Sequence, residues 1–152
     1  MPRLMTALAT VAALALPGLA NAQDMDPNVA ARQSLMDLYA YNLGVLGGMA
    51  QARIDYDADL ASAAATSLYH LSMAGTERMW AEGTDNMSVE GTRALPAIWD
   101  NAEDFEAHEA ALVTAAEAMM EAAGTDLASL QGAMGGLGRA CGACHQTYRQ
   151  PE

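Results

Sequence analysis

Near the end of the chain lies a group of residues that can attach a metal-containing cofactor. Cys141, Cys144 and His145 form a Cys-x-x-Cys-His pattern, with Gly142 and Ala143 between the two cysteines. On a helix, residues three and four apart share a face, so both thiols and the imidazole would project together. This pattern is typical of covalent haem attachment, in which two thioether bonds hold the porphyrin and the imidazole binds iron. We therefore expect one covalently bound haem c, with His145 as an axial ligand of the iron.

Three other uses of the two cysteines compete with this interpretation. A thioredoxin-like redox pair would begin a helix that follows a strand, whereas this pair lies near the C-terminus. A structural zinc site needs four ligands, and the remaining histidines, His70 and His108, form no second ligand pair. A disulfide between positions three apart on one helix is geometrically awkward and leaves His145 without a role. The pattern favours haem over all three.

The segment that carries these residues shows the clearest helical pattern in the chain. Apolar residues and the cysteines recur at alternating spacings of three and four from Thr125 or Asp126 onward, as in the seam of a helical bundle. The residues of this seam are Leu127, Leu130, Met134, Leu137, Cys141, Cys144 and Tyr148. Four glycines interrupt the same helix, and each costs about 1 kcal/mol of helix propensity relative to alanine. We expect a close approach to the backbone, such as that of a flat macrocycle, at Gly132, Gly135, Gly136 and Gly138.

Three further segments have helical periodicity, and none shows the alternation of a half-buried strand. The first should begin at Asp26-Pro27 and end near Ala50, with a buried stripe of Met36, Tyr39, Leu43, Leu46 and Ala50. The second should run from Asp57 to about Ala74, with a stripe of Leu60, Ala64, Leu68 and Leu71. The third should run from Asn101 to Gly124, with Phe105, Leu112, Ala116 and Met119 inside. The fold class is all-α, and we expect an antiparallel four-helix bundle with the haem attached near the C-terminus.

The segment from Thr76 to Asp100 is too long for a simple connection. It contains glycines and a proline among polar residues, so the sequence predicts a loop without regular structure. Loops of this length are uncommon unless they cover something, which makes this one a candidate lid over a cofactor edge. Trp80 and Trp99 flank it and are expected to anchor the loop. His70 and His108 are expected to be solvated.

The first 22 residues have the pattern of a secretory signal peptide. A cationic start at Arg3 precedes an apolar run from Leu4 to Leu19, which ends in the small-x-small sequence Ala20-Asn21-Ala22. The run is short for a membrane span and contains a proline, which disfavours an uncleaved anchor. We expect residues 1–22 to be removed, leaving one domain over residues 23–152 without membrane insertion. In a Gram-negative host this export would place the protein in the periplasm.

The charge of the chain excludes several classes of partner. The 7 basic residues, all arginine, face 19 acidic ones, for a formal net charge of -12. A surface that neutralises phosphates cannot be built from this composition, so we expect no nucleic-acid binding. Long-range attraction instead favours a redox partner with a basic docking surface, or one that meets the less acidic region around Arg139 and Arg149. The acidic residues form no convincing carboxylate pair, so enzymatic turnover is not expected.

The mature sequence resembles the class II c-type cytochromes, the cytochrome c-prime family. The resemblance covers nearly the whole of residues 23–152. It rests on the C-terminal position of the attachment pattern together with short segments elsewhere. These are Gly-Arg-Ala-Cys-Gly-Ala-Cys-His-Gln-Thr-Tyr-Arg (138–149), Arg-Gln-Ser-Leu-Met (32–36), Gly-Thr-Asp (83–85) and Ala-Ile-Trp (97–99).

The resemblance implies roles for individual residues. His145 would be the proximal iron ligand, with Cys141 and Cys144 as the thioether links. Arg32 and Gln33 would lie near the haem propionates, where a charge-assisted hydrogen bond is physically reasonable. Arg149, one turn after His145, resembles the arginine that the family places beside the proximal histidine. The family also implies a homodimer through the first two helices.

Met36 decides between two functional subtypes, and the resemblance leaves both open. Arg32 and Met36 are four residues apart on the first helix, so Met36 would lie on the distal side of the iron if Arg32 is at the haem rim. If Met36 is the sixth ligand, the protein is a low-spin electron carrier. If it only fills space, the iron is five-coordinate and NO or CO can bind. Two further alternatives are that Met36 is ordinary core and that the bundle is a haem-free scaffold.

Overall fold

The computed structural model describes residues 25–151. Its regular structure consists of α1 (Pro27–Ala50), α2 (Ala58–Ser72), a short 3-10 helix η1 (Glu77–Met79), α3 (Ala97–Asp100), α4 (Ala102–Ala123) and α5 (Leu127–Tyr148). Across these residues the only β-type pairing is one isolated antiparallel bridge, between Ala94 and Arg149. The all-α prediction is confirmed. The predicted signal peptide, residues 1–22, lies outside the described residues.

Local capping explains where three of the long helices begin. The carboxylate of Asp26 accepts hydrogen bonds from the backbone N–H groups of Asn28 and Val29, directly before Pro27 in the first turn. Asp57 and Asp126 cap α2 and α5 in the same way. Such side chains satisfy backbone donors that have no partner within the helix. The predicted helix starts are therefore confirmed.

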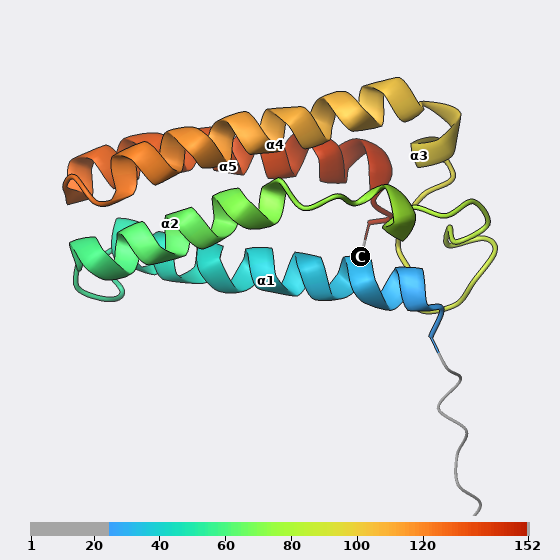
Figure 1. Cartoon of the computed structure of the whole chain (residues 1–152), viewed down its shortest axis with the longest axis horizontal. Coiled ribbons are helices and arrows are strands. Elements are labelled where there is room, and N and C mark those ends of the chain that lie inside the picture. Colours follow the sequence, from blue (N-terminus) through green and yellow to red (C-terminus); the bar gives the residue numbers. More distant parts are fainter. Residues whose placement is uncertain (1–24, 152) are drawn as a thin grey trace, which may run out of the picture.

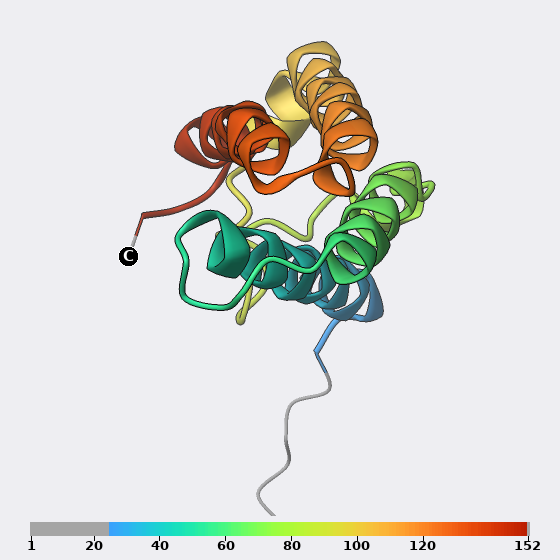
Figure 2. The ribbon, with the colours of Figure 1, turned by 90° about the vertical axis from the view of Figure 1, so that its left-hand side faces the viewer.

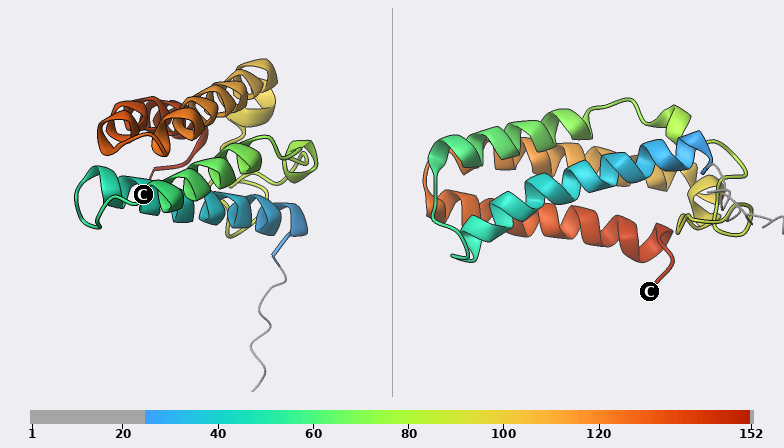
Figure 3. Two further views of the ribbon diagram at one scale, coloured as in Figure 1. Left: turned by 60° about the vertical axis from the view of Figure 1, so that its left-hand side comes forward. Right: turned by 90° about the horizontal axis from the view of Figure 1, so that it is seen from below.

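The four long helices form an antiparallel bundle, as predicted. Figure 1 shows consecutive long helices running in opposite directions. In the end-on view of Figure 2, α1 neighbours α2 and α5, while α4 neighbours the same two helices on the other side. Figure 3 shows that α1 and α5 lie close where α5 begins and diverge toward the end where α5 ends. The two helices are therefore farther apart at the end that carries the attachment pattern.

The core is built from large side chains on all four long helices. Fully buried examples are Leu46 and Met49 on α1, Leu68 on α2, Met119 on α4, and Leu130 and Leu137 on α5. Close packing of these side chains supplies most of the driving force for folding. A second, smaller cluster of Ile98, Phe105 and Tyr148 lies around α3 and the end of α5.

One residue in each of two predicted stripes was wrong. On α1, Leu35 is buried whereas Met36 is 38% exposed. On α2, Ala61 is fully buried whereas Leu60 is 47% exposed. The other predicted members of both stripes are buried or packed against the core, so these two stripes are otherwise confirmed. The seam of α5 is confirmed, because all seven of its residues are buried or half-buried.

The connection between α2 and α4, residues 73–101, is more ordered than predicted. Besides η1 and α3, it is held by a hydrogen bond from Trp99 Nε1 to the carbonyl of Trp80, at 2.9 Å. The Thr76 hydroxyl donates to the carboxylate of Glu109 on α4, at 2.7 Å. We refer to residues 73–101 as the connecting segment. The tryptophan contact supports the predicted anchoring role, and short helical turns correct the prediction of a structureless loop.

No helix within residues 25–151 combines the length and the apolar character needed to cross a membrane.

Candidate haem site

The end of the bundle that carries the attachment pattern contains a large cavity. Its volume is about 910 Å³, and its walls come from α1, α2, α4, α5 and the connecting segment. This is at the upper end of the range of about 300–1,000 Å³ for small-molecule and cofactor sites. The seven residues predicted to form the site all line it: Arg32, Gln33, Met36, Cys141, Cys144, His145 and Arg149.

The α5 wall presents the attachment pattern to this cavity. Cys141, Cys144 and His145 are half-buried, and both cysteines are free thiols. Burial raises the pKa of the Cys141 thiol, and burial together with nearby negative charges raises that of Cys144 to about 11. Burial and the charges of Arg149 and Arg93 lower the pKa of His145. A lowered pKa favours the neutral imidazole, the form that binds a metal.

The α1 wall faces α5 across the cavity with Arg32, Gln33 and Met36. These residues are one and four positions apart, which places Arg32 and Met36 on one face of the helix. The thioether of Met36 and the imidazole of His145 thus line the same cavity from two different helices. Tyr39, a further turn along α1, also lines it and is buried.

Arg32 is engaged by the connecting segment. Its side chain is only 4% exposed, and its guanidinium donates to the Met79 carbonyl and to the Thr84 and Thr92 hydroxyls at 3.2, 2.8 and 2.7 Å. A further hydrogen bond goes to the carbonyl of Thr84. The guanidinium also lies 5.0 Å from the centre of the Trp80 ring, a cation–π distance. Arg32 therefore organises the segment that closes the cavity.

Gln33 and Arg149 also contact the connecting segment. Gln33 Nε2 donates to the carbonyl of Gly91 at 2.6 Å. The backbone of Arg149 pairs with that of Ala94, and the Tyr148 carbonyl accepts from the N–H of Leu95. The end of α5 is thus tied to the connecting segment directly after His145.

Sequence reasoning missed several residues that line the cavity. His108 was expected to be solvated, which was wrong: its side chain is 23% exposed and its ring packs edge-on against Tyr148. Its position could have been predicted from the spacing, because His108 lies three residues after Phe105 and four before Leu112 and so continues the predicted stripe of that helix. His70 is exposed, as predicted. Trp80 also lines the cavity, packed edge-on against Phe105.

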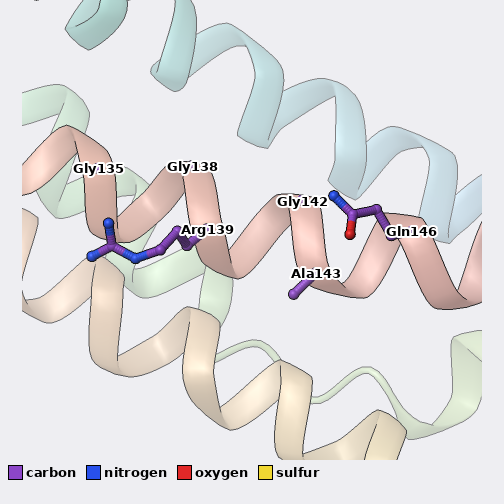
Figure 4. A pocket seen from close by; sticks show the side chains of 6 residues that line it. All are labelled: Gly135, Gly138, Arg139, Gly142, Ala143 and Gln146. Carbon is purple, nitrogen blue, oxygen red and sulfur yellow. The ribbon is translucent and has the colours of Figure 1, made fainter.

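Most glycines of α5 have no close neighbour, although Arg139 Nη1 would lie 3.3 Å from a Cβ added at Gly135. A Cβ added at Gly132, Gly136 or Gly138 would meet no described heavy atom within 4 Å. Figure 4 shows Gly135, Gly138 and Gly142 along a shallow hollow on α5, beside Arg139 and Gln146. This hollow is separate from the large cavity, since the two share no lining residue. The predicted close approach to this backbone is wrong for the described residues.

The residues of the large cavity fit a haem. It offers two thiols and an imidazole on one helical face, an apolar and aromatic lining, and a buried cation in Arg32 suited to an acidic group. The indole Nε1 of Trp80 is buried at the cavity wall with no hydrogen-bond partner among the described residues.

Comparisons with known proteins agree with this fit. The sequence profile of the family described as Cytochrome C' matches residues 27–149. Cytochrome c-554 of Cereibacter sphaeroides is 44% identical over 144 residues, which cover 94% of each chain. The structure of cytochrome c' from Rhodobacter spheriodes superposes with a TM-score of 0.80 at 35% identity, covering 82% of this chain and 96% of the other.

Structures of cytochrome c prime variants from Alcaligenes xylosoxidans, one a nitric oxide complex and one carbon monoxide-bound, are also similar. Each has a TM-score of 0.71 at 30% identity and covers 82% of this chain and 94% of the other. The profile match, the identities and the bundle geometry together show that the chain belongs to the cytochrome c' family, whose members are c-type cytochromes with covalently attached haem.

Proposed function

We propose that this protein is an electron-transfer cytochrome whose single haem is held by Cys141 and Cys144 through thioether bonds and by His145 as an axial ligand. When bound, the haem supplies a one-electron ferric/ferrous couple. The convergence of these three side chains on one wall of a cavity of about 910 Å³ supports the assignment.

The position of Met36 is the observation that favours electron transfer over gas binding. Its thioether lines the cavity from α1, opposite the helix that bears His145. A methionine paired with a histidine is a recognised axial set of electron-carrying c-type haems. We infer that Met36 is the sixth ligand and that Arg32, one turn earlier, keeps this part of α1 fixed against the connecting segment.

A second function has its own support. Met36 is 38% exposed, and two structurally similar cytochromes c prime are nitric oxide and carbon monoxide complexes. If Met36 stays off the iron, the distal side of this cavity would accept NO or CO.

The test is the optical spectrum of the holoprotein, ferric and ferrous, with and without CO. We expect a low-spin spectrum with a sharp ferrous α-band that CO leaves unchanged, because both axial positions are filled. Met36→Ala should produce a high-spin spectrum and ready CO binding. Met73→Ala is the matched control, since Met73 also lines the cavity but from the start of the connecting segment, directly after α2. A wild-type spectrum that is already high-spin and shifts with CO would support gas binding instead.

We further infer that residues 1–22 are removed on export and that the mature domain, beginning at Gln23, functions in the periplasm. N-terminal sequencing of the purified holoprotein tests this. The net charge of -12 supports a redox partner with a basic surface, whose association should slow as salt rises. Exposed Leu38, Tyr41 and Leu60 on α1 and α2 support the implied homodimer, which sedimentation would measure.

A further inference from the structure

One wall of the cavity carries a polar cluster that neither haem attachment nor iron ligation uses. It consists of Asp104 and His108 on α4 and Tyr148 on α5, and we call it the α4–α5 polar cluster. The Tyr148 hydroxyl donates to Asp104 Oδ2 at 2.5 Å. His108 Nε2 lies 3.6 Å from the same oxygen. The His108 and Tyr148 rings meet edge-on with centroids 5.8 Å apart.

The cluster connects the cavity to solvent. His108 and Tyr148 both line the cavity, and Tyr148 is 3% exposed. Asp104 does not line it, and its side chain is 64% exposed. His108 therefore has one side toward the cofactor cavity and the other beside a carboxylate in contact with water. A proton can reach its imidazole without crossing the cavity.

Charged and titratable groups on α4, α5 and the connecting segment share the cavity with His108 or lie beside it. Asp104 and Glu109 on its own helix are acidic, and the connecting segment adds Glu77 to the cavity wall. The cavity wall also contains Arg93 on the connecting segment and four titratable groups on α5. Those on α5 are the Cys144 thiol, the His145 imidazole, the Tyr148 phenol and the Arg149 guanidinium. The two arginines act on His145, whose pKa they lower. Asp104 is the acidic group at ion-pair distance from His108. Its carboxylate would pair with an imidazolium at this position.

We propose that His108 is a redox-linked proton site: it takes up one proton from solvent when the haem in this cavity accepts one electron from a one-electron donor. Reduction adds one negative charge to the cavity, and a nearby imidazolium offsets that charge. The proton goes to the His108 ring, where it strengthens the ion pair with Asp104. Because such coupling is reciprocal, protonation of His108 must make reduction easier by the same factor.

This inference rests on the proposed haem attachment at Cys141, Cys144 and His145, but not on ligation by Met36. Imidazole is the side chain whose charge changes near neutral pH, so the coupling would act under physiological conditions. We expect the ferrous protein to bind this proton about tenfold more tightly than the ferric protein, the size of a single unit-charge interaction. A tenfold difference corresponds to 59 mV for a one-electron couple.

The test is the reduction potential of the holoprotein measured from pH 5 to pH 9. The wild-type potential should fall by about 59 mV more than that of His108→Asn across this range, since the variant cannot titrate at this position. His70→Asn is the matched control, because His70 is exposed on α2 and does not line the cavity. We expect it to follow the wild-type curve. A His108→Asn curve that matches the wild-type curve would overturn the proposal.

A second readout needs no variant. The ring protons of His108 can be titrated by NMR in the ferric and ferrous states, and the midpoint should be higher in the ferrous state by about one pH unit. Equal midpoints would overturn the redox link even if His108→Asn failed to fold. Failure of this inference still leaves a measurable potential and an unchanged optical spectrum. Failure of the proposed function leaves no covalently bound haem to titrate.

Discussion

Arg32 links the first helix of the bundle to a segment about fifty residues later in the chain. Its guanidinium donates to carbonyl and hydroxyl oxygens of Met79, Thr84 and Thr92, all within the connecting segment. Burial lowers the pKa of this guanidinium, partly offset by the charges of Asp26 and Asp85. A planar fork of donors suits such a set of acceptors, and an ammonium group does not.

Replacing Arg32 by lysine should therefore weaken the fold although the charge is kept. We expect Arg32→Lys to lower the free energy of unfolding by about 2–3 kcal/mol, because buried acceptors lose their partners. Urea denaturation of the holoprotein measures this. Gln33→Ala is the control: its single, exposed hydrogen bond to Gly91 should be worth less than about 1 kcal/mol. Equal losses in the two variants would contradict the role assigned to Arg32.

At the scale of elements, α5 combines a well-packed seam with an outer face rich in glycine. The seam residues Leu130, Leu137 and Tyr148 are buried, while Gly132 and Gly138 are exposed and meet no described neighbour. Gly124, at the end of α4, is different: an added Cβ would lie 2.1 Å from Ser62 Oγ on α2. The two kinds of glycine should respond differently to alanine.

Gly132→Ala should raise the free energy of unfolding by about 0.4–1 kcal/mol, because alanine restricts the unfolded chain and suits a helix. Gly124→Ala should change it less, because rotation of the Ser62 hydroxyl relieves the 2.1 Å contact and the next neighbours lie at 3.4 and 3.6 Å. Thermal or urea unfolding of the holoprotein checks both. A destabilised Gly132→Ala protein would mean that something not described here approaches the outer face of α5.

At the scale of the whole molecule, two buried tyrosines couple global stability to high pH. Burial, with the charge of Glu109, raises the pKa of Tyr39 to about 12. The hydrogen bond to Asp104, with burial, raises the pKa of Tyr148 to about 12. In the unfolded chain a tyrosine ionises near pH 10. Between these values the folded protein binds more protons than the unfolded chain.

Stability should accordingly be complete below about pH 10 and should fall as the pH rises from about 10 to about 12. Urea unfolding at intervals across this range measures the loss. Tyr148→Phe should reduce the slope, because one of the two linked protons is gone, while Tyr41→Phe, at an exposed tyrosine, serves as control. A slope that is unchanged in Tyr148→Phe would contradict the linkage.

Features that depend only on residues close together in the sequence were predictable from it. The capping aspartates Asp26, Asp57 and Asp126 mark their helices because an N-cap bonds to backbone only two or three residues ahead. The heptad spacing of α5 and the Cys141–His145 pattern are equally local, and together they indicated an all-α bundle with a cofactor near its end. The resemblance to a known family added Arg32, Gln33, Met36 and Arg149, and all four line the cavity.

Features that depend on packing between helices and on the path of the connecting segment were decided only by the tertiary structure. Packing buried Leu35 and Ala61, whereas Met36 and Leu60 at the start of the predicted stripes stay exposed. The partners of Arg32 are 47 to 60 residues away, and no local pattern specifies such a contact. His108 entered the cavity wall because the end of α5 placed Tyr148 against it. Local spacing determines which residues share a helical face, whereas packing among all four helices determines what that face meets.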